Sequence, residues 1–222
     1  MKNAAQLVAS ALRSIRMRAS PRYHAHVTAT YWSTTDDTHG DMAGEAFDFY
    51  AERIAALLGA PAQAGLVLDH NAGDGGIGMR LHKLGYRVEF SEFSPRFVTR
   101  ILAAGFACQA PDRIAPASFD TIFVNNAIFY IHPSKLLAQV DWLLERVKPG
   151  GTLLLLDVPT VQRAHHLPAG VLRRVFRRLT GVFQPDAGGF FVDEARIARH
   201  FKNVEIAESW CNYRCHLIIR KR

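Results

Sequence analysis

The sequence predicts an α/β domain built on a doubly wound, largely parallel sheet. Apolar strand-like segments and amphipathic helical segments alternate from residue 66 to the C-terminus, which is the pattern of successive βαβ units. The segment 152–157 is apolar up to its last residue, as expected for a strand covered on both faces. A glycine-rich turn follows the first strand and leads directly into a helix.

Helices are expected where apolar residues recur at helical spacing and a stop residue follows. Gly59 and Gly85 each end a helix, whereas Ser94 and Pro95 supply the cap and first residue of another. The segment 31–44 is polar and rich in Gly, Asp and Thr, so we expect a surface loop there. Apart from the helix that begins at Pro95, the expected helices cover residues 10–17, 45–58, 76–84, 134–146 and 193–200.

Strands are expected where short apolar runs lie between turn residues. Such runs cover residues 66–69, 87–91, 106–109, 119–125, 152–157, 204–207 and 213–219. Because most of these runs are separated by helices, we expect their connections to be crossovers and their pairing to be mainly parallel.

Length and composition are those of one globular domain. The chain has 222 residues, of which 49% are hydrophobic and 21% are charged. No apolar run in the sequence approaches the roughly 20 residues that a membrane-spanning helix requires. Cys108, Cys211 and Cys215 make no even-numbered disulfide framework, so we expect a cytoplasmic protein.

The net charge of +7 is concentrated in two segments. Residues 1–35 and residues 158–185 each hold five Lys or Arg and no acidic residue, and the rest of the chain carries 17 basic and 20 acidic residues. The first segment predicts an amphipathic basic helix, with a mitochondrial-type presequence as the minor alternative. The second places an apolar stripe beside four arginines, which indicates a lid helix or contact with an anionic substrate or membrane surface. The stripe and the arginines are Leu172, Val175, Phe176, Leu179, Arg173, Arg174, Arg177 and Arg178.

The turn after the first strand has the composition of a nucleotide-binding loop. Gly73, Gly75 and Gly78 let the backbone approach a ligand closely, and the following helix presents its N-terminus to that ligand. Glu92 lies nineteen positions after Gly73, at the end of the second strand, where a carboxylate can accept hydrogen bonds from ribose hydroxyls. The segment therefore predicts a cofactor with a nucleoside part.

The three glycines also fit the dinucleotide pattern G-x-G-x-x-G, so a nicotinamide cofactor is the first alternative. Three features count against it. Asp69 stands inside the strand end, four residues before Gly73; a helical region precedes the first strand; and the segment 147–152, Val-Lys-Pro-Gly-Gly-Thr, leads straight into an apolar strand.

Four segments, in order and at matching spacing, resemble the motifs of class I S-adenosylmethionine-dependent methyltransferases of the small-molecule type. They are the first motif at 68–75, the ribose-acid motif at 88–95, the "F-D-x-V" motif at 119–126 and the "R-x-L-K-P-G-G" motif at 146–153. The resemblance covers residues 66–157. It implies a seven-stranded sheet with an antiparallel last strand, an N-terminal helical cap, and S-adenosyl-L-methionine as the cofactor.

The resemblance implies roles for the residues of the first loop. Asp69 would fix the loop and help to hold the methionine amino group, and Ala72, Gly73 and Gly75 would cradle the amino-acid part through their backbone. Asn71 stands where the family has its first loop glycine. Asn tolerates positive φ better than other non-glycine residues, so the turn can form, but the side chain would crowd the cofactor.

The same resemblance assigns the remaining cofactor contacts. Glu92 would hold the ribose, Phe93 would lie against adenine, and Asn125 would face the methionine moiety near the sulfonium. Gln109 is the first candidate for the adenine amine and Asp112 the second. No set of His, Asp, Glu or Cys shows metal-ligand spacing, so no metal is expected.

Methyl transfer to a hydroxyl needs a base that works near neutral pH, and histidine is the usual one. Tyr130 and His132 follow the fourth strand, where they can face the acceptor or only pack against and cap the next helix. His165 and His166 lie in the segment that commonly forms a lid in this family, where they are either a base or two solvent-exposed histidines.

The expected function is methylation of a small molecule, with a hydroxyl of a sugar, lipid-linked compound or secondary metabolite as acceptor. A non-catalytic binding protein of the same fold and an RNA methyltransferase are the alternatives, although basic residues without interleaved aromatic residues make nucleic acid an unlikely partner. We expect one domain, divided into an N-terminal helical cap at 1–63, a cofactor-binding core at 64–157, a lid insertion at 158–192 and closing elements at 193–222.

Overall fold

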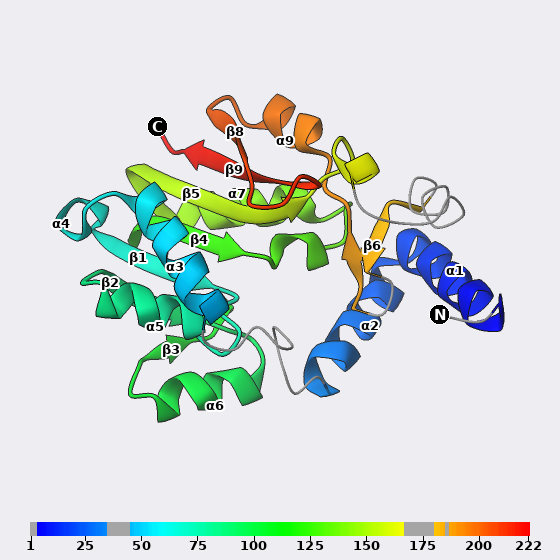
Figure 1. Cartoon of the computed structure of the whole chain (residues 1–222), viewed down its shortest axis with the longest axis horizontal. Helices are drawn as coiled ribbons and strands as arrows, with labels where there is room; N and C mark the ends of the chain where they lie inside the picture. The colour runs from blue at the N-terminus through cyan, green and yellow to red at the C-terminus, as the bar shows by residue number, and fades with distance from the viewer. Residues whose placement is uncertain (1–3, 35–44, 167–179, 185–186) are drawn as a thin grey trace. The chain divides into compact units, whose positions relative to one another are not determined.

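The computed structural model describes residues 4–34, 45–166, 180–184 and 187–222 (Figure 1). Its main feature is a seven-stranded sheet with the strand order β3-β2-β1-β4-β5-β9-β8. The strands are β1 (Leu66–His70), β2 (Arg87–Ser91), β3 (Cys108–Gln109), β4 (Phe119–Asn125), β5 (Val147–Pro159), β8 (Val204–Glu208) and β9 (Arg214–Arg220). The prediction of a mostly parallel sheet with an antiparallel last strand is confirmed.

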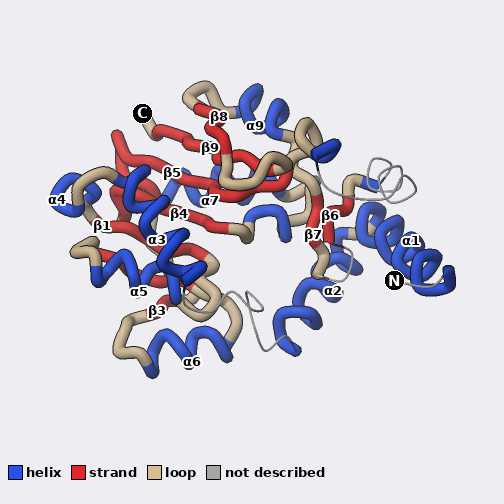
Figure 2. Tube along the Cα trace, in the orientation of Figure 1, coloured by secondary structure: helices blue, strands red, loops and turns tan. Residues whose placement is uncertain are grey.

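The α-helices that alternate with these strands are α3 (Glu45–Leu58), α4 (Pro61–Ala64), α5 (Gly76–Lys83), α6 (Pro95–Ala103), α7 (Leu136–Arg146) and α9 (Glu194–His200) (Figure 2). The predicted stop signals agree with the observed ends. Gly59 has positive φ directly after α3, Gly85 has positive φ two residues after the end of α5, and Pro95 is the first residue of α6. Asp193 caps α9 by accepting a hydrogen bond from the Arg196 N–H.

The N-terminal segment forms two helices, α1 (Ala4–Ala19) and α2 (Pro21–Thr34). The sequence predicted a shorter first helix and a loop from residue 31, and this prediction was wrong for residues 31–34. Pro21 both ends α1 and begins α2, because proline fits the first position of a helix, where its missing N–H is not needed. Tyr31 and Trp32 therefore lie on a helix.

A second, two-stranded sheet pairs β6 (Val182–Gln184) with β7 (Gly189–Phe190) in antiparallel fashion, and the sequence did not predict it. Short 3-10 helices occupy Pro111–Arg113, Ile128–Tyr130 and Ala164–His166. The four arginines predicted on a lid helix, residues 173, 174, 177 and 178, lie outside the described residues. In the part of the chain that is described, no helix is both long and apolar enough to cross a bilayer.

The chain divides into two compact units. Unit 1 comprises Met1–Thr34, Asn126–Val140 and Leu156–Leu217, and unit 2 comprises Thr35–Asn125, Asp141–Leu155 and Ile218–Arg222. Helices α1 and α2 thus belong to unit 1, whereas α3 belongs to unit 2, where it packs against α5. The division into cap, core, lid and closing elements stays a prediction.

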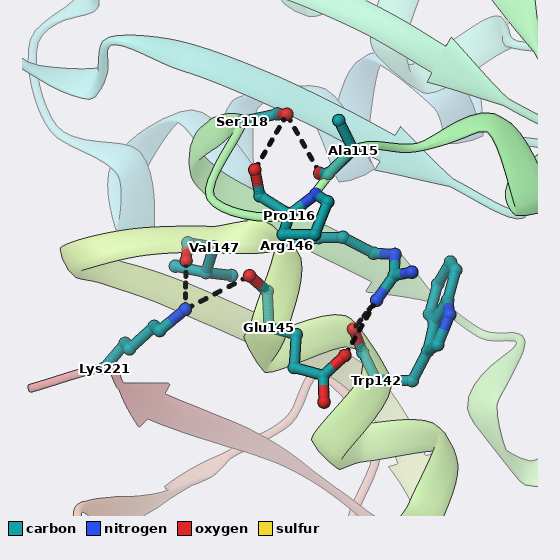
Figure 3. Close-up of polar contacts among 8 residues, drawn as sticks. All are labelled: Ala115, Pro116, Ser118, Trp142, Glu145, Arg146, Val147 and Lys221. Atoms are coloured by element: carbon teal, nitrogen blue, oxygen red, sulfur yellow. Dashed lines mark hydrogen bonds and ion pairs between the residues drawn. The ribbon is translucent and has the colours of Figure 1, made fainter.

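The segment that joins α7 to β5 is held by side chains that reach back to main-chain carbonyls (Figure 3). Arg146 donates to the Trp142 carbonyl at 2.8 Å, and its guanidinium lies 3.7 Å from the centre of the Trp142 ring. Lys221, beyond the last strand, donates to the Val147 carbonyl at 2.6 Å. These contacts tie the last turn of α7 and the start of β5 to side chains near them.

Two of the sequence motifs meet each other inside unit 2. Lys148 of the late motif donates to the Asp120 carboxylate of the fourth-strand motif at 2.8 Å, and the same carboxylate accepts the Leu66 N–H at 2.8 Å. The Lys148 ammonium lowers the pKa of Asp120 below its usual range. A Cβ on Gly151 would overlap the Asp120 carbonyl oxygen, and one on Gly65 would overlap its carboxylate. These motif residues hold the amino ends of the strands together.

Candidate functional site

The turn after β1, residues 71–75, is the first part of the candidate site. Asn71, Gly73 and Gly75 have φ values of 56°, 58° and 79°, so the chain turns through three left-handed residues between β1 and α5. Asn71 adopts the conformation that its place in the motif requires, as the sequence predicted. The Ala72 N–H donates to the Ser91 carbonyl at 3.2 Å, which holds the turn against the end of β2.

Asp69 fixes the beginning of α5. Its carboxylate is buried and accepts the Gly78 N–H at 3.2 Å. Burial raises its pKa well above the ordinary value, and the carboxylates of Glu92 and Asp74 act in the same direction. A Cβ on Gly78 would overlap the Phe90 ring and approach this carboxylate, so only glycine fits here.

Glu92 is bound almost entirely by backbone donors. Its Oε1 accepts the N–H groups of Phe93 and Ser94, both at 2.9 Å, and its Oε2 accepts the Gly73 N–H at 2.8 Å. Burial raises the pKa of Glu92, while these three donors act against the shift. A carboxylate has about four acceptor sites. The arrangement therefore leaves one acceptor site on Oε2 for a further donor, such as a hydroxyl.

Phe93 and Asn125 are two further residues of unit 2 that have the features of ligand contacts. The Phe93 side chain, next to the buried Glu92, is 54% exposed. Within the described residues, neither the Oδ1 nor the Nδ2 atom of Asn125 has a hydrogen-bond partner, although both atoms are buried. Buried amide atoms are nearly always satisfied, so this amide is suited to a polar ligand.

The two adenine-side candidates differ in their surroundings. Gln109 lies on β3, and its side chain donates to Glu89 at 3.3 Å while its carbonyl accepts the Glu92 N–H at 3.3 Å. Asp112 lies exposed in the 3-10 helix Pro111–Arg113. Gln109 is thus connected directly to the backbone of the ribose candidate, whereas Asp112 faces solvent.

The four predicted acceptor-side residues belong to unit 1 and fall into two groups. The Tyr130 hydroxyl donates to Gln184 Oε1 at 2.6 Å. The Trp32 and Tyr130 rings lie edge to face with their centres 5.1 Å apart, and burial raises the pKa of Tyr130. His165 and His166 lie exposed in a 3-10 helix with their ring centres 3.9 Å apart. Tyr130 thus forms a polar pair within an aromatic cluster, and the two histidines are open to solvent.

His132 is buried, and both of its ring nitrogens are engaged. Nδ1 accepts the Ser134 N–H at 3.2 Å and lies 2.7 Å from the Ser134 hydroxyl, while Nε2 lies 3.3 Å from the Arg18 carbonyl. Because Nδ1 accepts a hydrogen bond from the Ser134 N–H, the ring proton is on Nε2, which donates to the Arg18 carbonyl. In this state His132 caps the turn before α7, the structural alternative that the sequence left open.

Sequence reasoning missed a buried ionic centre in unit 1. Arg214, at the start of β9, donates to Asp157 Oδ2 at 2.6 Å and to the Asn126 Oδ1. Asn126 follows β4 and Asp157 lies near the end of the adjacent strand β5, each with φ of 55°. Ser209 donates to Asp157 Oδ1 at 2.6 Å. The available signal was a charged residue, Asp157, at the end of the apolar run 152–157 and another, Arg214, near the start of the last predicted strand.

The sequence matches no protein-family model and no curated protein, but solved structures share its fold. Magnesium protoporphyrin IX methyltransferase from Synechocystis PCC 6803, crystallised with S-adenosylmethionine, is 15% identical with a TM-score of 0.61, covering 90% of this chain and 97% of its own. Burkholderia thailandensis 1,6-didemethyltoxoflavin-N1-methyltransferase, with bound S-adenosylhomocysteine, is 16% identical with a TM-score of 0.59, covering 91% and 90%. The amino pentose methyltransferase CalS10 from Micromonospora echinaspora is 15% identical with a TM-score of 0.57, covering 87% and 95%. The chain therefore has the Rossmann-like fold of these methyltransferases.

Proposed function

We propose that this chain is an S-adenosylmethionine-dependent methyltransferase that acts on a small molecule. The observation that carries the proposal is the Asn125 amide, whose two buried polar atoms have no partner within the described residues at the carboxyl end of β4. An unsatisfied buried amide costs about 1–3 kcal/mol, and a bound ligand with a polar amino-acid part would remove this cost. Asn125 is the residue that the motif resemblance assigns to the methionine moiety.

Glu92 and Phe93 fit the nucleoside part of the same cofactor. The acceptor site that remains on the Glu92 carboxylate suits one ribose hydroxyl, and the exposed Phe93 ring offers an apolar face for adenine. The Gly73 N–H, which binds Glu92, fixes the carboxylate in position before any ligand arrives. The residues that are present therefore fit S-adenosylmethionine, and a nicotinamide dinucleotide is the less suitable ligand.

The cofactor would supply a methyl group activated by its sulfonium charge, so the protein mainly has to align the acceptor and exclude water. We propose a hydroxyl acceptor. His165 and His166 are the predicted histidines whose rings reach solvent, and one of them can serve as the base. The Tyr130 hydroxyl, which donates to Gln184, can accept a hydrogen bond from the acceptor and so help to orient it. The acceptors named for the structural neighbours, a porphyrin, a toxoflavin precursor and an amino pentose, are all small molecules.

The test is calorimetric titration of S-adenosylmethionine into the wild type and into Asn125→Leu. Removal of the unsatisfied amide should leave the free protein as stable as before or more stable. Cofactor affinity should fall by about 5- to 150-fold, because the ligand loses about 1–3 kcal/mol of hydrogen bonding. Glu52→Gln, an exposed change on α3, is the matched control and should bind like the wild type. Wild-type protein that binds no cofactor at millimolar concentration would overturn the proposal.

Glu92→Ala separates the nucleoside contact from the methionine contact. The substitution should weaken cofactor binding by a few kcal/mol at most, which is the scale of charged hydrogen bonds. It also removes the partner of three backbone N–H groups, so the free energy of unfolding must be measured in parallel. Unchanged affinity in a folded variant would show that the ribose lies elsewhere.

A further inference from the structure

Helix α1 exposes a short apolar stripe on one face. Leu12 and Ile15, three residues apart and therefore neighbours on one helix face, are 58% and 53% exposed. Ser14 and Met17 of the same helix are buried, and Met17 forms a cluster with Val182 and Phe190 of the two-stranded sheet. The helix is thus anchored in unit 1 by one face and presents a second apolar face to solvent.

Arginines border this stripe on both sides. At 100° per residue, Arg16 lies next to Leu12 on one side and Arg18 next to Ile15 on the other, and both side chains are exposed. The Arg16 guanidinium lies 4.5 Å from the centre of the Tyr23 ring, so its apolar stem runs along the helix pair while its charge stays at the surface. Arg22, at the start of α2, is also exposed.

The charge of the N-terminal segment that carries the stripe is of one sign. Residues 1–35 hold five Lys or Arg and no Asp or Glu, so no carboxylate of this segment offsets the arginines. Exposed leucine and isoleucine are suited to the acyl boundary of a bilayer, and flanking arginines are suited to phosphate and carboxylate headgroups just above it. A nucleic acid would be expected to use the arginines but not the aliphatic stripe.

We infer that α1 docks this chain on an anionic membrane surface, with Leu12 and Ile15 inserted among the acyl chains and Arg16 and Arg18 on the headgroups. The helix lies in the plane of the interface and does not cross the bilayer. This inference rests on α1 alone and is independent of the proposed function. A protein that methylates a lipid-linked or poorly soluble acceptor would meet its substrate at such a surface.

The test is co-flotation of the full chain with two kinds of vesicle, phosphatidylcholine alone and phosphatidylcholine containing phosphatidylglycerol. Binding is expected only to the vesicles with phosphatidylglycerol and should weaken as salt is raised. Arg16→Gln with Arg18→Gln should lower the partition coefficient about fivefold per arginine, the effect of removing one cation near an anionic surface. Leu12→Glu with Ile15→Glu should abolish binding.

Matched controls carry the same chemistry elsewhere on the surface. Leu84→Glu with Leu102→Glu changes two residues that are 49% and 54% exposed, and Lys83→Gln with Arg87→Gln removes two exposed cations. Both control variants should float like the wild type. Equal loss in the controls would show nonspecific charge attraction and overturn the inference.

Two other occupants of the stripe give distinct results. If a second copy covers it, light scattering will show a dimer that Leu12→Glu with Ile15→Glu dissociates, and no vesicles will bind. If RNA covers it, binding will depend on Arg16 and Arg18 and be insensitive to Leu12 and Ile15. Either result would overturn the inference.

Discussion

The turn after β1 and the strand ends near Asn126 and Asp157 both contain left-handed residues, but different kinds of contact hold them in place. Each region contains an asparagine in the left-handed conformation, Asn71 with φ of 56° and Asn126 with φ of 55°. Around Asn71, the glycines and the Glu92 carboxylate fix the backbone through main-chain N–H groups. Asn126, by contrast, is bound through its side chain by Arg214, which also binds Asp157.

The difference teaches which kinds of site can be recognised in a sequence. Backbone-held turns require particular residues close together in the chain, and so they leave a motif. The ionic centre joins residues that are 57 and 88 positions apart, and any fold that brings these strand ends together can build it. The stability of a region held by long-range side chains also depends more on each of those side chains. Removing one partner of a buried ion pair leaves the other charge buried without compensation.

The largest expected effect breaks the ionic centre. Arg214→Met leaves the buried Asp157 without its cation and should lower the free energy of unfolding by about 3–5 kcal/mol, measured by denaturant titration. Arg214→Met with Asp157→Asn should recover most of this loss, since Asn keeps the left-handed φ and carries no charge. Arg220→Met, at the exposed end of the same strand, should stay within about 0.5 kcal/mol of the wild type.

The second prediction concerns pH and the region of the turn. His70, buried at the end of β1 and 3.1 Å from the Ser91 hydroxyl, has its pKa lowered to about 4, first by burial and then by the charge of Arg146. Its folded pKa is below the unfolded value of about 6.5, so its stabilising contribution is present above pH 6.5 and is lost as the pH falls to 4. Over this range the wild type should lose about 3 kcal/mol more than His70→Gln.

The control for this prediction is His26→Gln, which removes an exposed histidine of α2. Its unfolding free energy should follow that of the wild type at every pH. A wild type and a His70→Gln variant with parallel pH profiles would contradict the prediction, because the histidine would then titrate alike in the folded and unfolded chain.

The smallest expected effect compares the two asparagines directly. Asn126→Gly removes a charged hydrogen bond and should lower the free energy of unfolding by about 1.5–3 kcal/mol. Asn71→Gly keeps the left-handed turn and should change it by less than about 1 kcal/mol. Only Asn71→Gly should tighten binding of S-adenosylmethionine in calorimetry, because it removes the side chain that the motif resemblance expects to crowd the cofactor. Equal losses of stability in the two variants would show that the regions are held alike.

Much of the fold could be predicted because its signals are local. Residues 45–58, 87–91 and 119–125 form the elements that their apolar spacing and glycine stops predicted, with the same boundaries. Helix α2 was not predicted, because its polar sequence has a weak apolar period. Strand β5 begins five residues earlier than predicted, because Lys148 and Gly150 read as a turn while their backbone continues the strand.

The candidate site divides in the same way. The loop residues, Glu92 and Asn125 lie where the motif spacing placed them, and their roles in cofactor binding stay predictions. The sequence left capping by His132 as one of two alternatives. It could not show that Gln184 accepts the Tyr130 hydroxyl, because these two residues lie in distant segments. The buried Arg214 was missed for the same reason.

The pairing of Asp120 with Lys148 has a consequence for how chains of this kind are recognised. Two of the four sequence motifs meet at the amino ends of the strands, where they brace the sheet, while the carboxyl ends carry the residues suited to ligands. A descendant could therefore lose Glu92 and Asn125, and with them the predicted chemistry, yet keep Asp120 and Lys148, the half of the signature that carries the architecture. A match to that half of the signature indicates a shared fold. Whether such a chain is active has to be judged from the polar residues at the carboxyl ends of the strands.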